Sequence, residues 1–295
     1  MLRQTFLYYY YFDRMALKKY KPYTPSRRFM LGYDFSDITT NKPEKSLTKF
    51  IGSTGWRNNQ WRTTSRFMWG WHKRLYRIVD FKWYDKCDIP AKVASIEYDP
   101  YRTARIALLN YADGEKRYVL AWKGIKVGDE VMAGEKAPIA AGNRKQLKDI
   151  PEGMTVYNLE VTPFSTGKII KSAGSSALIS GRDEATGLVF IKMPSGEVRK
   201  FNKNCWATIG QLGNEQHKNV VIGKAGRQRW KWKKPHILWK NMNPVDHPHG
   251  GWEAHSPIGS KRWQKSFSGK RVAAGIKTRS NKKWSTKFIV SGRTK

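Results

Sequence analysis

The stretch AKVASIEYDPYRTARIALLNYADGEKRYVLAW, residues 91–122, decides the fold class of this chain of 295 residues. It contains three short runs, AKVASIEYD, ARIALLNY and KRYVLAW, whose β-branched and aromatic residues are typical of strands. Asp113 and Gly114 separate the last two runs, at a place where a tight turn needs residues that accept positive φ. We therefore predict an antiparallel hairpin here.

Similar runs continue on both sides of this stretch, and turn residues separate most of them. Pro194, Ser195 and Gly196 lie between two such runs and predict a second hairpin. Runs this short, without helical periodicity between them, favour small closed barrels, so we predict an all-β fold. The further predicted strands are YRIVDF (76–81), TVYNLEV (155–161), KIIKSAG (168–174), SALIS (176–180), GLVFIKM (187–193) and EVRKF (197–201).

The segments between and around these strands predict how the chain is divided. Residues 134–153 carry glycines and prolines and interrupt the strand pattern, so we expect a boundary between two barrels near residue 141. Residues 1–70 and 211–295 lack sustained periodicity and should become ordered only on a partner. The predicted parts are an N-terminal extension (1–60), a first barrel (61–140), a second barrel (141–210) and a basic C-terminal extension (211–295).

The charge of the chain indicates its partner. It has 56 Lys and Arg against 23 Asp and Glu, a formal net charge of +33, and residues 211–295 hold 20 of the basic residues and only three of the acidic ones. A polyanion such as nucleic acid would neutralise this charge.

No apolar run reaches the roughly 18 residues needed to cross a bilayer, so we expect no membrane partner. Cys87 and Cys205 form no CxxC pattern and predict neither a disulfide framework nor a cysteine-based zinc site.

Two stretches of the C-terminal extension carry the most distinctive residues. Lys224 to Lys240, KAGRQRWKWKKPHILWK, alternates cations with tryptophans, which suits phosphates and stacked bases better than a small core. Asn243 to Gly251, NPVDHPHGG, predicts a shaped, exposed loop, because its prolines exclude a helix and its paired glycines permit close approach. A zinc site usually needs three ligands on rigid elements, so RNA contacts are favoured over a metal site formed by Asp246, His247, His249 and His255.

Cations also lie along the predicted strands of the first barrel. Arg102 and Arg105 stand at the entry to one strand, and Lys82, Lys92 and Arg117 lie on or beside its neighbours. The open face of a small barrel could gather them to bind an oligonucleotide. Each could equally be a solvated cation that protects a strand edge from aggregation.

The chain resembles the universal family of large-subunit ribosomal protein two, called "L-two", in its bacterial and organellar form. The resemblance covers roughly residues 50–295, and its most specific motifs are IPAKVASIEYDPYRTARIALL (89–109), GIKVGDEVMAG (124–134), ATIGQLGN (207–214), GKAGRQRW (223–230), MNPVDHPHGG (242–251) and KTRSNKKWSTKFIV (277–290).

This resemblance implies an oligonucleotide-binding-type (OB) barrel followed by an SH3-like barrel, with extensions that run into ribosomal RNA near the peptidyl-transferase centre. It also implies a structural protein and no enzyme, no resident cofactor apart from Mg²⁺ bridged through RNA, and no homo-oligomer. The expected partners are large-subunit RNA, neighbouring ribosomal proteins and the small subunit. Pattern and resemblance together predict as RNA-binding residues Lys82, Lys92, Arg102, Arg105, Arg117, Lys171, Lys224, Arg227, Arg229, Trp230, Asn243, Asp246, His247, His249, Gly250, Gly251, Lys277, Arg279, Lys282 and Lys283.

Several tryptophans depart from the family's pattern, which usually has glycine or arginine at these positions. Tryptophan lacks glycine's freedom at positive φ and arginine's phosphate-binding fork, so the contacts there must differ. Such divergence favours a mitochondrial ribosome, with a plastid or bacterial ribosome as the alternative. The departures are Trp56, Trp61, Trp69, Trp71, Trp83, Trp206, Trp239 and Trp252.

Two other functions compete with the ribosomal one. A metal-dependent hydrolase would use the Asp246, His247, His249 and His255 cluster and would bind stoichiometric zinc. A generic single-strand-binding barrel would stack bases of any strand without a ribosomal location.

Overall fold

The computed structural model describes residues 17–68, 70, 73–251, 263–272, 279–280 and 282–293. These residues form two compact units. Unit 1 comprises the described residues of 1–52, 72–225 and 287–295, and unit 2 those of 53–71 and 226–286. Trp69, Trp71, Trp252, His255 and Lys277, all named above, lie outside the described residues.

A four-stranded antiparallel sheet of unit 1 is built from the stretch that predicted the fold class. Its order is β7-β6-β5-β8, and the predicted hairpin is confirmed by the pairing of Ile106 with Leu120 through Asn110 with Lys116. Gly114 lies in the turn with φ of 84°, a conformation that glycine adopts without strain. The strands are β5 (Ala91–Glu97), β6 (Ile106–Tyr111), β7 (Lys116–Leu120) and β8 (Glu130–Val131).

A seven-stranded antiparallel sheet, also in unit 1, has the order β17-β15-β14-β13-β10-β16-β9. The second predicted hairpin is confirmed, since β14 and β15 pair and Gly196 in their turn has φ of 82°. The strands are β9 (Arg144–Gln146), β10 (Thr155–Tyr157), β13 (Ala177–Asp183), β14 (Leu188–Lys192), β15 (Val198–Asn202), β16 (Trp206–Ile209) and β17 (Ile289–Ser291).

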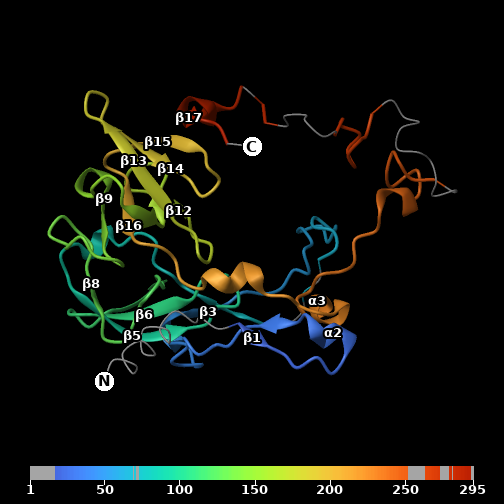
Figure 1. Ribbon diagram of the computed structural model, residues 1–295, viewed down its shortest axis with the longest axis horizontal. Coiled ribbons are helices and arrows are strands. Elements are labelled where there is room, and N and C mark those ends of the chain that lie inside the picture. The colour runs from blue at the N-terminus through green and yellow to red at the C-terminus, as the bar shows by residue number, and fades with distance from the viewer. Residues whose placement is uncertain are drawn as a thin grey trace, which may run out of the picture. The chain divides into compact units, whose positions relative to one another are not determined.

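Two segments of this sheet differ from the expectation. Residues 134–153 were predicted to interrupt the strands, yet they contain β9, which pairs with β16. The C-terminal extension was predicted to become ordered only on a partner, but its β17 pairs with β15 of the same chain (Figure 1). A three-residue strand is too short to show periodicity, so pattern alone misses both elements.

The other elements are short. Helices and 3₁₀ turns are few among the described residues, so the all-β prediction is confirmed, and none of these helices is long and apolar enough to span a membrane. The remaining strands are β1 (Lys18–Lys19), β2 (Leu31–Gly32), β3 (Thr48–Phe50), β4 (Leu75–Arg77), β11 (Leu159–Glu160) and β12 (Gly167–Ile169). The helices are α2 (Pro25–Arg28), α3 (Ala225–Trp230) and the 3₁₀ turns Lys45–Leu47, Tyr84–Lys86, Leu147–Asp149, Glu215–Asn219, Trp239–Asn241 and Trp284–Phe288.

One hydrophobic cluster joins the two larger sheets of unit 1. Ile106 and Leu109 of β6, Ile179 of β13, Ile191 of β14 and Ile209 of β16 are all almost fully buried in it. Burial of such aliphatic side chains contributes roughly 1.5–3 kcal/mol each. The sheets are therefore held together by shared packing as well as by the chain that connects them.

A buried ion pair lies within this packing. Arg144 of β9 is fully buried, and its Nη2 donates to Glu160 Oε1 at 3.0 Å. Its other guanidinium nitrogens donate to the carbonyl oxygens of Asn158 (2.8 Å) and Lys82 (3.1 Å) and to Thr208 Oγ1 (3.2 Å). A buried charge is tolerated when it is paired and hydrogen-bonded in this way. Nothing in the sequence pattern singled out Arg144.

Candidate nucleic-acid interface

Arg102 and Lys171 meet over one aromatic ring of unit 1. Lys171 Nζ lies 4.1 Å from the centroid of the Phe81 ring, and Arg102 Cζ lies 5.6 Å from the same centroid. The two cations are far apart in sequence, so the fold brings them together. Neither the shared ring nor the convergence could be read from the sequence, because both depend on the loops between strands.

The local structure holds both cations in place. Arg102 is tethered by the buried carboxylate of Asp99, which also accepts the Tyr101 N–H at 2.9 Å. Lys171 follows Ile170, whose φ of 57° is rare for a β-branched residue and marks local strain. Partial burial lowers the pKa of Lys171 below its ordinary value, and the neighbouring Arg102 lowers it further. An anion placed between these two cations would relieve their repulsion.

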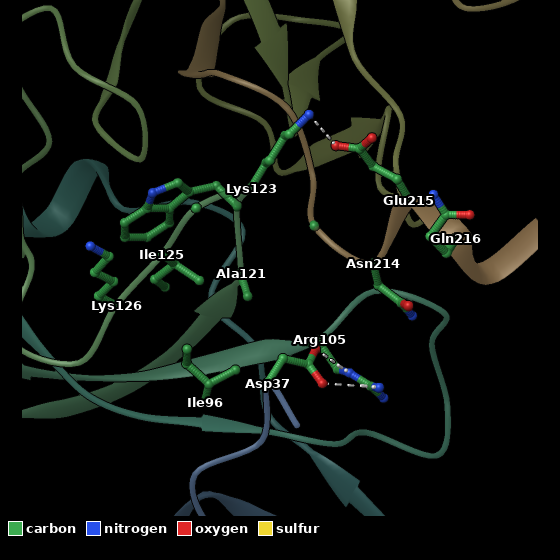
Figure 2. Close-up of a pocket in the computed structure, with 13 residues that line it drawn as sticks. Asp37, Ile96, Arg105, Ala121, Lys123, Ile125, Lys126, Asn214, Glu215 and Gln216 are labelled. Carbon is green, nitrogen blue, oxygen red and sulfur yellow. Dashed lines mark hydrogen bonds and ion pairs between the residues drawn. The ribbon is translucent and has the colours of Figure 1, made fainter. Parts of the chain in front are cut away.

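Arg105 has a different environment, although the same reasoning selected it. Its Nε donates to Asp37 Oδ2 at 3.0 Å, and its guanidinium lies 5.0 Å from the Phe35 ring centroid. The residue is buried rather than on an open face. Figure 2 shows this ion pair, together with that of Lys123 and Glu215, at a cavity of about 440 Å³. Because carboxylates pair with both cations, this cavity offers little to a phosphate.

Arg117 is similarly occupied within unit 1. It lies 2.7 Å from Asp80 and from Asp85 and 2.8 Å from Glu115, measured between guanidinium nitrogens and carboxylate oxygens. These hydrogen bonds hold the pKa of Asp85 below its ordinary range. The arrangement is that of a structural cation, and the predicted RNA contact of Arg117 stays a prediction.

Lys82 and Lys92, two further predicted contacts in unit 1, face solvent. Lys92 forms an exposed ion pair with Glu130 at 3.2 Å. Lys82 is exposed, with its Nζ 5.8 Å from the Tyr84 ring centroid. Both positions allow a contact with a large polyanion.

The loop from Met242 to Gly251, in unit 2, closes on itself. The Gly251 N–H donates to the Met242 carbonyl at 3.1 Å, and the Asp246 and His247 N–H groups donate to the Asn243 carbonyl. A Cβ at position 250 would lie 2.4 Å from the Met242 oxygen, so only glycine fits there. Position 251 has no such neighbour. The close approach predicted for the paired glycines is thus, at Gly250, to the loop's own first residues.

The prediction of an exposed loop is wrong for two of its residues. Asn243 and Asp246 are exposed, but His247 and His249 are only 1% and 3% exposed. His247 stacks on Trp239, with ring centroids 5.0 Å apart and an interplanar angle of 13°. The imidazoles are buried because an aromatic cluster covers them, and the local sequence does not reveal which distant rings take part.

The histidines already use nitrogen lone pairs within unit 2. The His249 N–H donates to His247 Nδ1 at 3.0 Å, and the Lys265 N–H donates to His249 Nε2 at 2.7 Å. A metal ion would have to displace these backbone donors. Among the residues that the structure describes, no group of three or more His, Cys, Asp or Glu could hold a metal ion. The geometry gives no support to a hydrolytic metal site.

The remaining predicted residues lie on short basic elements. Lys224 precedes α3, which carries Arg227, Arg229 and Trp230, and Trp230 is 70% exposed. Near the end of the chain, Arg279, Lys282 and Lys283 are exposed, and Arg279 Nη2 donates to Ser285 Oγ at 3.0 Å. Exposed cations and an exposed indole fit contact with a polyanion.

Comparison with known families gives two matches. Residues 44–133 match the family model described as "Ribosomal Proteins L2, RNA binding N-terminal domain". Residues 140–269 match the model described as "Ribosomal Proteins L2, C-terminal domain". Together the matches cover well over half of the chain.

Proposed function

Because the chain belongs to the ribosomal protein L2 family, we propose that Arg102 and Lys171 form its main phosphate-binding site for large-subunit ribosomal RNA. The protein is a structural, RNA-binding constituent of the large ribosomal subunit and not an enzyme, and its all-β body combines an OB-type with an SH3-like barrel. Its partners are ribosomal RNA and other ribosomal proteins.

The convergence of the two cations on Phe81 carries this proposal. A guanidinium can bind a phosphate in a bidentate manner, and a nearby ammonium adds a point charge. Lys171 is partly desolvated, so its interaction with a phosphate is screened less than that of a fully exposed lysine. The two cations at Phe81 have one carboxylate between them, that of Asp99, which pairs with Arg102. Arg105 and Arg117 instead each have carboxylates of their own.

The test measures the affinity of the full chain for large-subunit RNA at several salt concentrations. Replacing both residues (Arg102→Gln with Lys171→Gln) should weaken binding. It should also reduce the magnitude of the slope of log affinity against log salt concentration by about 1.5, because roughly 0.7–0.9 of slope is lost with each phosphate contact. Lys203→Gln, which removes one exposed cation of unit 1, is the matched control and should change the slope by less than half as much. An unchanged slope in the double variant would refute the site.

The loop from Met242 to Gly251 is the second part of the proposal. We infer that it is embedded in ribosomal RNA near the peptidyl-transferase centre, with the exposed Asn243 and Asp246 as contacts. Burial of His247 and His249 supports a structural rather than a chemical role for these imidazoles. Mg²⁺ would act there only as a bridge through RNA.

The finer predictions about organisation and location belong to the same proposal. We propose the division into 1–60, 61–140, 141–210 and 211–295. The gap between the two family matches, from 133 to 140, supports the boundary between the two barrels. The divergent tryptophans support a mitochondrial ribosome, and contact with the small subunit without homo-oligomers follows from the family. The arms, including Lys277, Arg279, Lys282 and Lys283, would bind phosphates. Cryo-electron microscopy of the intact particle tests all of these.

A further inference from the structure

A cavity of about 410 Å³ lies within unit 2, between its segments 66–67, 236–242 and 266–268. Its size falls in the range of sites that bind small organic molecules, about 300–1,000 Å³. Aromatic rings form much of its lining, from Phe67, His236, Trp239 and Phe267. Flat rings on several sides favour a flat, aromatic occupant.

Two rings of this aromatic cavity pack against each other, and a guanidinium lies over a third. Phe67 and His236 have centroids 4.2 Å apart, and Arg66 Cζ lies 3.3 Å from the centroid of the Phe267 ring. Arg66 is exposed, and no described carboxylate pairs with it. The cavity therefore combines stacking faces with a guanidinium that can bind a phosphate or stack on a base.

Backbone hydrogen bonds hold the walls together independently of these side chains. The Lys234 N–H donates to the Phe67 carbonyl at 2.8 Å, and Met68 forms an antiparallel bridge with Lys233. These contacts join two segments that are more than 160 residues apart in sequence. A change of the Phe67 side chain should thus leave the wall in place.

The buried histidines support the opposite side of the cavity. His247 stacks on Trp239 and meets the Phe267 ring edge-on, with centroids 5.6 Å apart and an interplanar angle of 88°. Because both rings line the cavity, the imidazole fixes the spacing between them. This gives the buried histidine of the loop a physical role that RNA contact alone does not explain.

Unit 2 has the charge that a nucleic-acid site requires. Its sequence holds 18 Lys and Arg against two acidic residues, a formal net charge of +16. Two carboxylates can neutralise only a small part of that charge, so the surroundings of the cavity attract a phosphodiester backbone.

We propose that the aromatic cavity binds one unstacked base of single-stranded or looped RNA, with Arg66 on its phosphate or base edge. A base within a duplex cannot enter such a cavity, whereas unpaired bases in RNA loops stack readily on aromatic side chains. The inference rests on the proposed function, because it names the kind of RNA element that this family member would grip with unit 2.

The test compares two probes with equal numbers of phosphates, a short single-stranded oligoadenylate and an abasic oligomer of the same length. The full chain should bind the oligoadenylate roughly tenfold more tightly, in line with the effect of stacking a base on an aromatic side chain. Phe67→Leu should remove most of this preference while leaving the affinity for the abasic oligomer unchanged. Arg66→Gln is an exposed substitution that should not disturb folding. It should reduce the affinity for the oligoadenylate severalfold.

The matched control is Trp61→Leu, which removes an exposed ring of unit 2 that does not line the cavity. It should keep the base preference. Equal binding of both probes by the unmodified chain would overturn the proposal and point to a protein segment as the occupant. An equal loss in Trp61→Leu and Phe67→Leu would overturn it in favour of diffuse stacking. Neither outcome would affect the salt-slope test of Arg102 and Lys171, which reports on unit 1.

Discussion

Units 1 and 2 carry almost the same excess charge but place their aromatic residues in opposite ways. Unit 1 has a formal net charge of +17 over 215 residues, and unit 2 has +16 over 80. The three tryptophans of unit 1, Trp83, Trp122 and Trp206, are at most 5% exposed. Unit 2 holds the other ten, and six of those that the structure describes are between 41% and 71% exposed: Trp56, Trp61, Trp230, Trp239, Trp263 and Trp284.

This difference indicates that the two units obtain their stability from different sources. Unit 1 buries a continuous apolar core and pairs many of its cations with carboxylates, so its own packing supports its fold. The described residues of unit 2 include few buried side chains, and its positive charge is dense, so we expect neutralisation by RNA to contribute much of its stability. Substitutions should therefore affect the isolated protein strongly in unit 1 and weakly in unit 2.

The largest expected effect is at the buried ion pair of unit 1. Arg144→Met leaves the Glu160 carboxylate without its partner and should lower the free energy of unfolding by about 3–5 kcal/mol, measured by urea denaturation. Arg279→Met, at an exposed cation of unit 2, should change it by less than about 0.5 kcal/mol. An equal loss of unfolding free energy in the two variants would contradict the difference in stability between the two units.

The same variant has an expected pH dependence. Burial raises the pKa of Glu160 even beside Arg144, so the folded chain keeps a proton that the unfolded chain loses above its ordinary pKa. Stability then falls as pH rises between the ordinary and the raised value. Removing Arg144 removes an influence that lowers this pKa, so the loss of unfolding free energy in Arg144→Met should grow as pH rises through that range. A deficit that shrinks over this range would show that Glu160 is not the cause.

A slightly smaller effect on the free energy of unfolding is expected when two leucines, one from each unit, are replaced in turn. Leu109→Ala empties part of the unit 1 core and should cost about 2–5 kcal/mol of unfolding free energy. Leu238→Ala in unit 2, where the side chain is 70% exposed, should cost less than about 0.5 kcal/mol. If Leu238→Ala were as destabilising, unit 2 would have an apolar core after all.

His247→Ala should have an intermediate effect that is confined to unit 2. It removes the stack on Trp239 and leaves the His249 N–H without its acceptor, a loss of about 1–3 kcal/mol. Amide hydrogen exchange should become faster around residues 239–251 and stay unchanged in residues 106–120. His247→Asn offers a carbonyl in place of Nδ1 and should recover part of the loss. Faster exchange in both units would contradict a local role.

The smallest expected effect concerns tryptophans with positive φ. Trp61 has φ of 59° and is 66% exposed, so Trp61→Gly should relieve backbone strain and stabilise the chain by about 0.5–1 kcal/mol. Trp83 has φ of 62° but is buried, and its Nε1 donates to the Asp80 carbonyl at 3.2 Å. Trp83→Gly should therefore destabilise the chain, because the loss of the buried indole costs more free energy than the relief of backbone strain gains. Thermal unfolding measures the change in Tm of each variant. Changes of the same sign in both variants would refute this prediction.

Sequence reasoning was most successful where local chemistry dominates. Both hairpins were predicted because Asp113-Gly114 and Pro194-Ser195-Gly196 restrict the turn directly. It failed for β9 and β17, which are too short to show periodicity and form only because β16 and β15 offer edges to pair with. Arg144 was overlooked for a related reason, since its burial depends on acceptors from distant segments.

For the candidate site residues too, the sequence selects the residues and the fold decides their environment. Residue type and resemblance selected Arg102, Arg105, Lys171 and His247 as equivalent RNA contacts. Their environments separate them. Asp37 pairs with Arg105, and an aromatic cluster covers His247. Arg102 pairs with the Asp99 carboxylate and shares the Phe81 ring with a second cation, Lys171.

By itself the sequence determined the class of fold, the polyanionic partner and the family, because hydrophobic alternation, turn residues, net charge and motifs are properties of neighbouring residues or of the whole composition. Only the tertiary structure decided which cations are neutralised, which histidines are buried and which rings line a cavity. Those properties depend on side chains that are distant in sequence and meet only when the chain has folded.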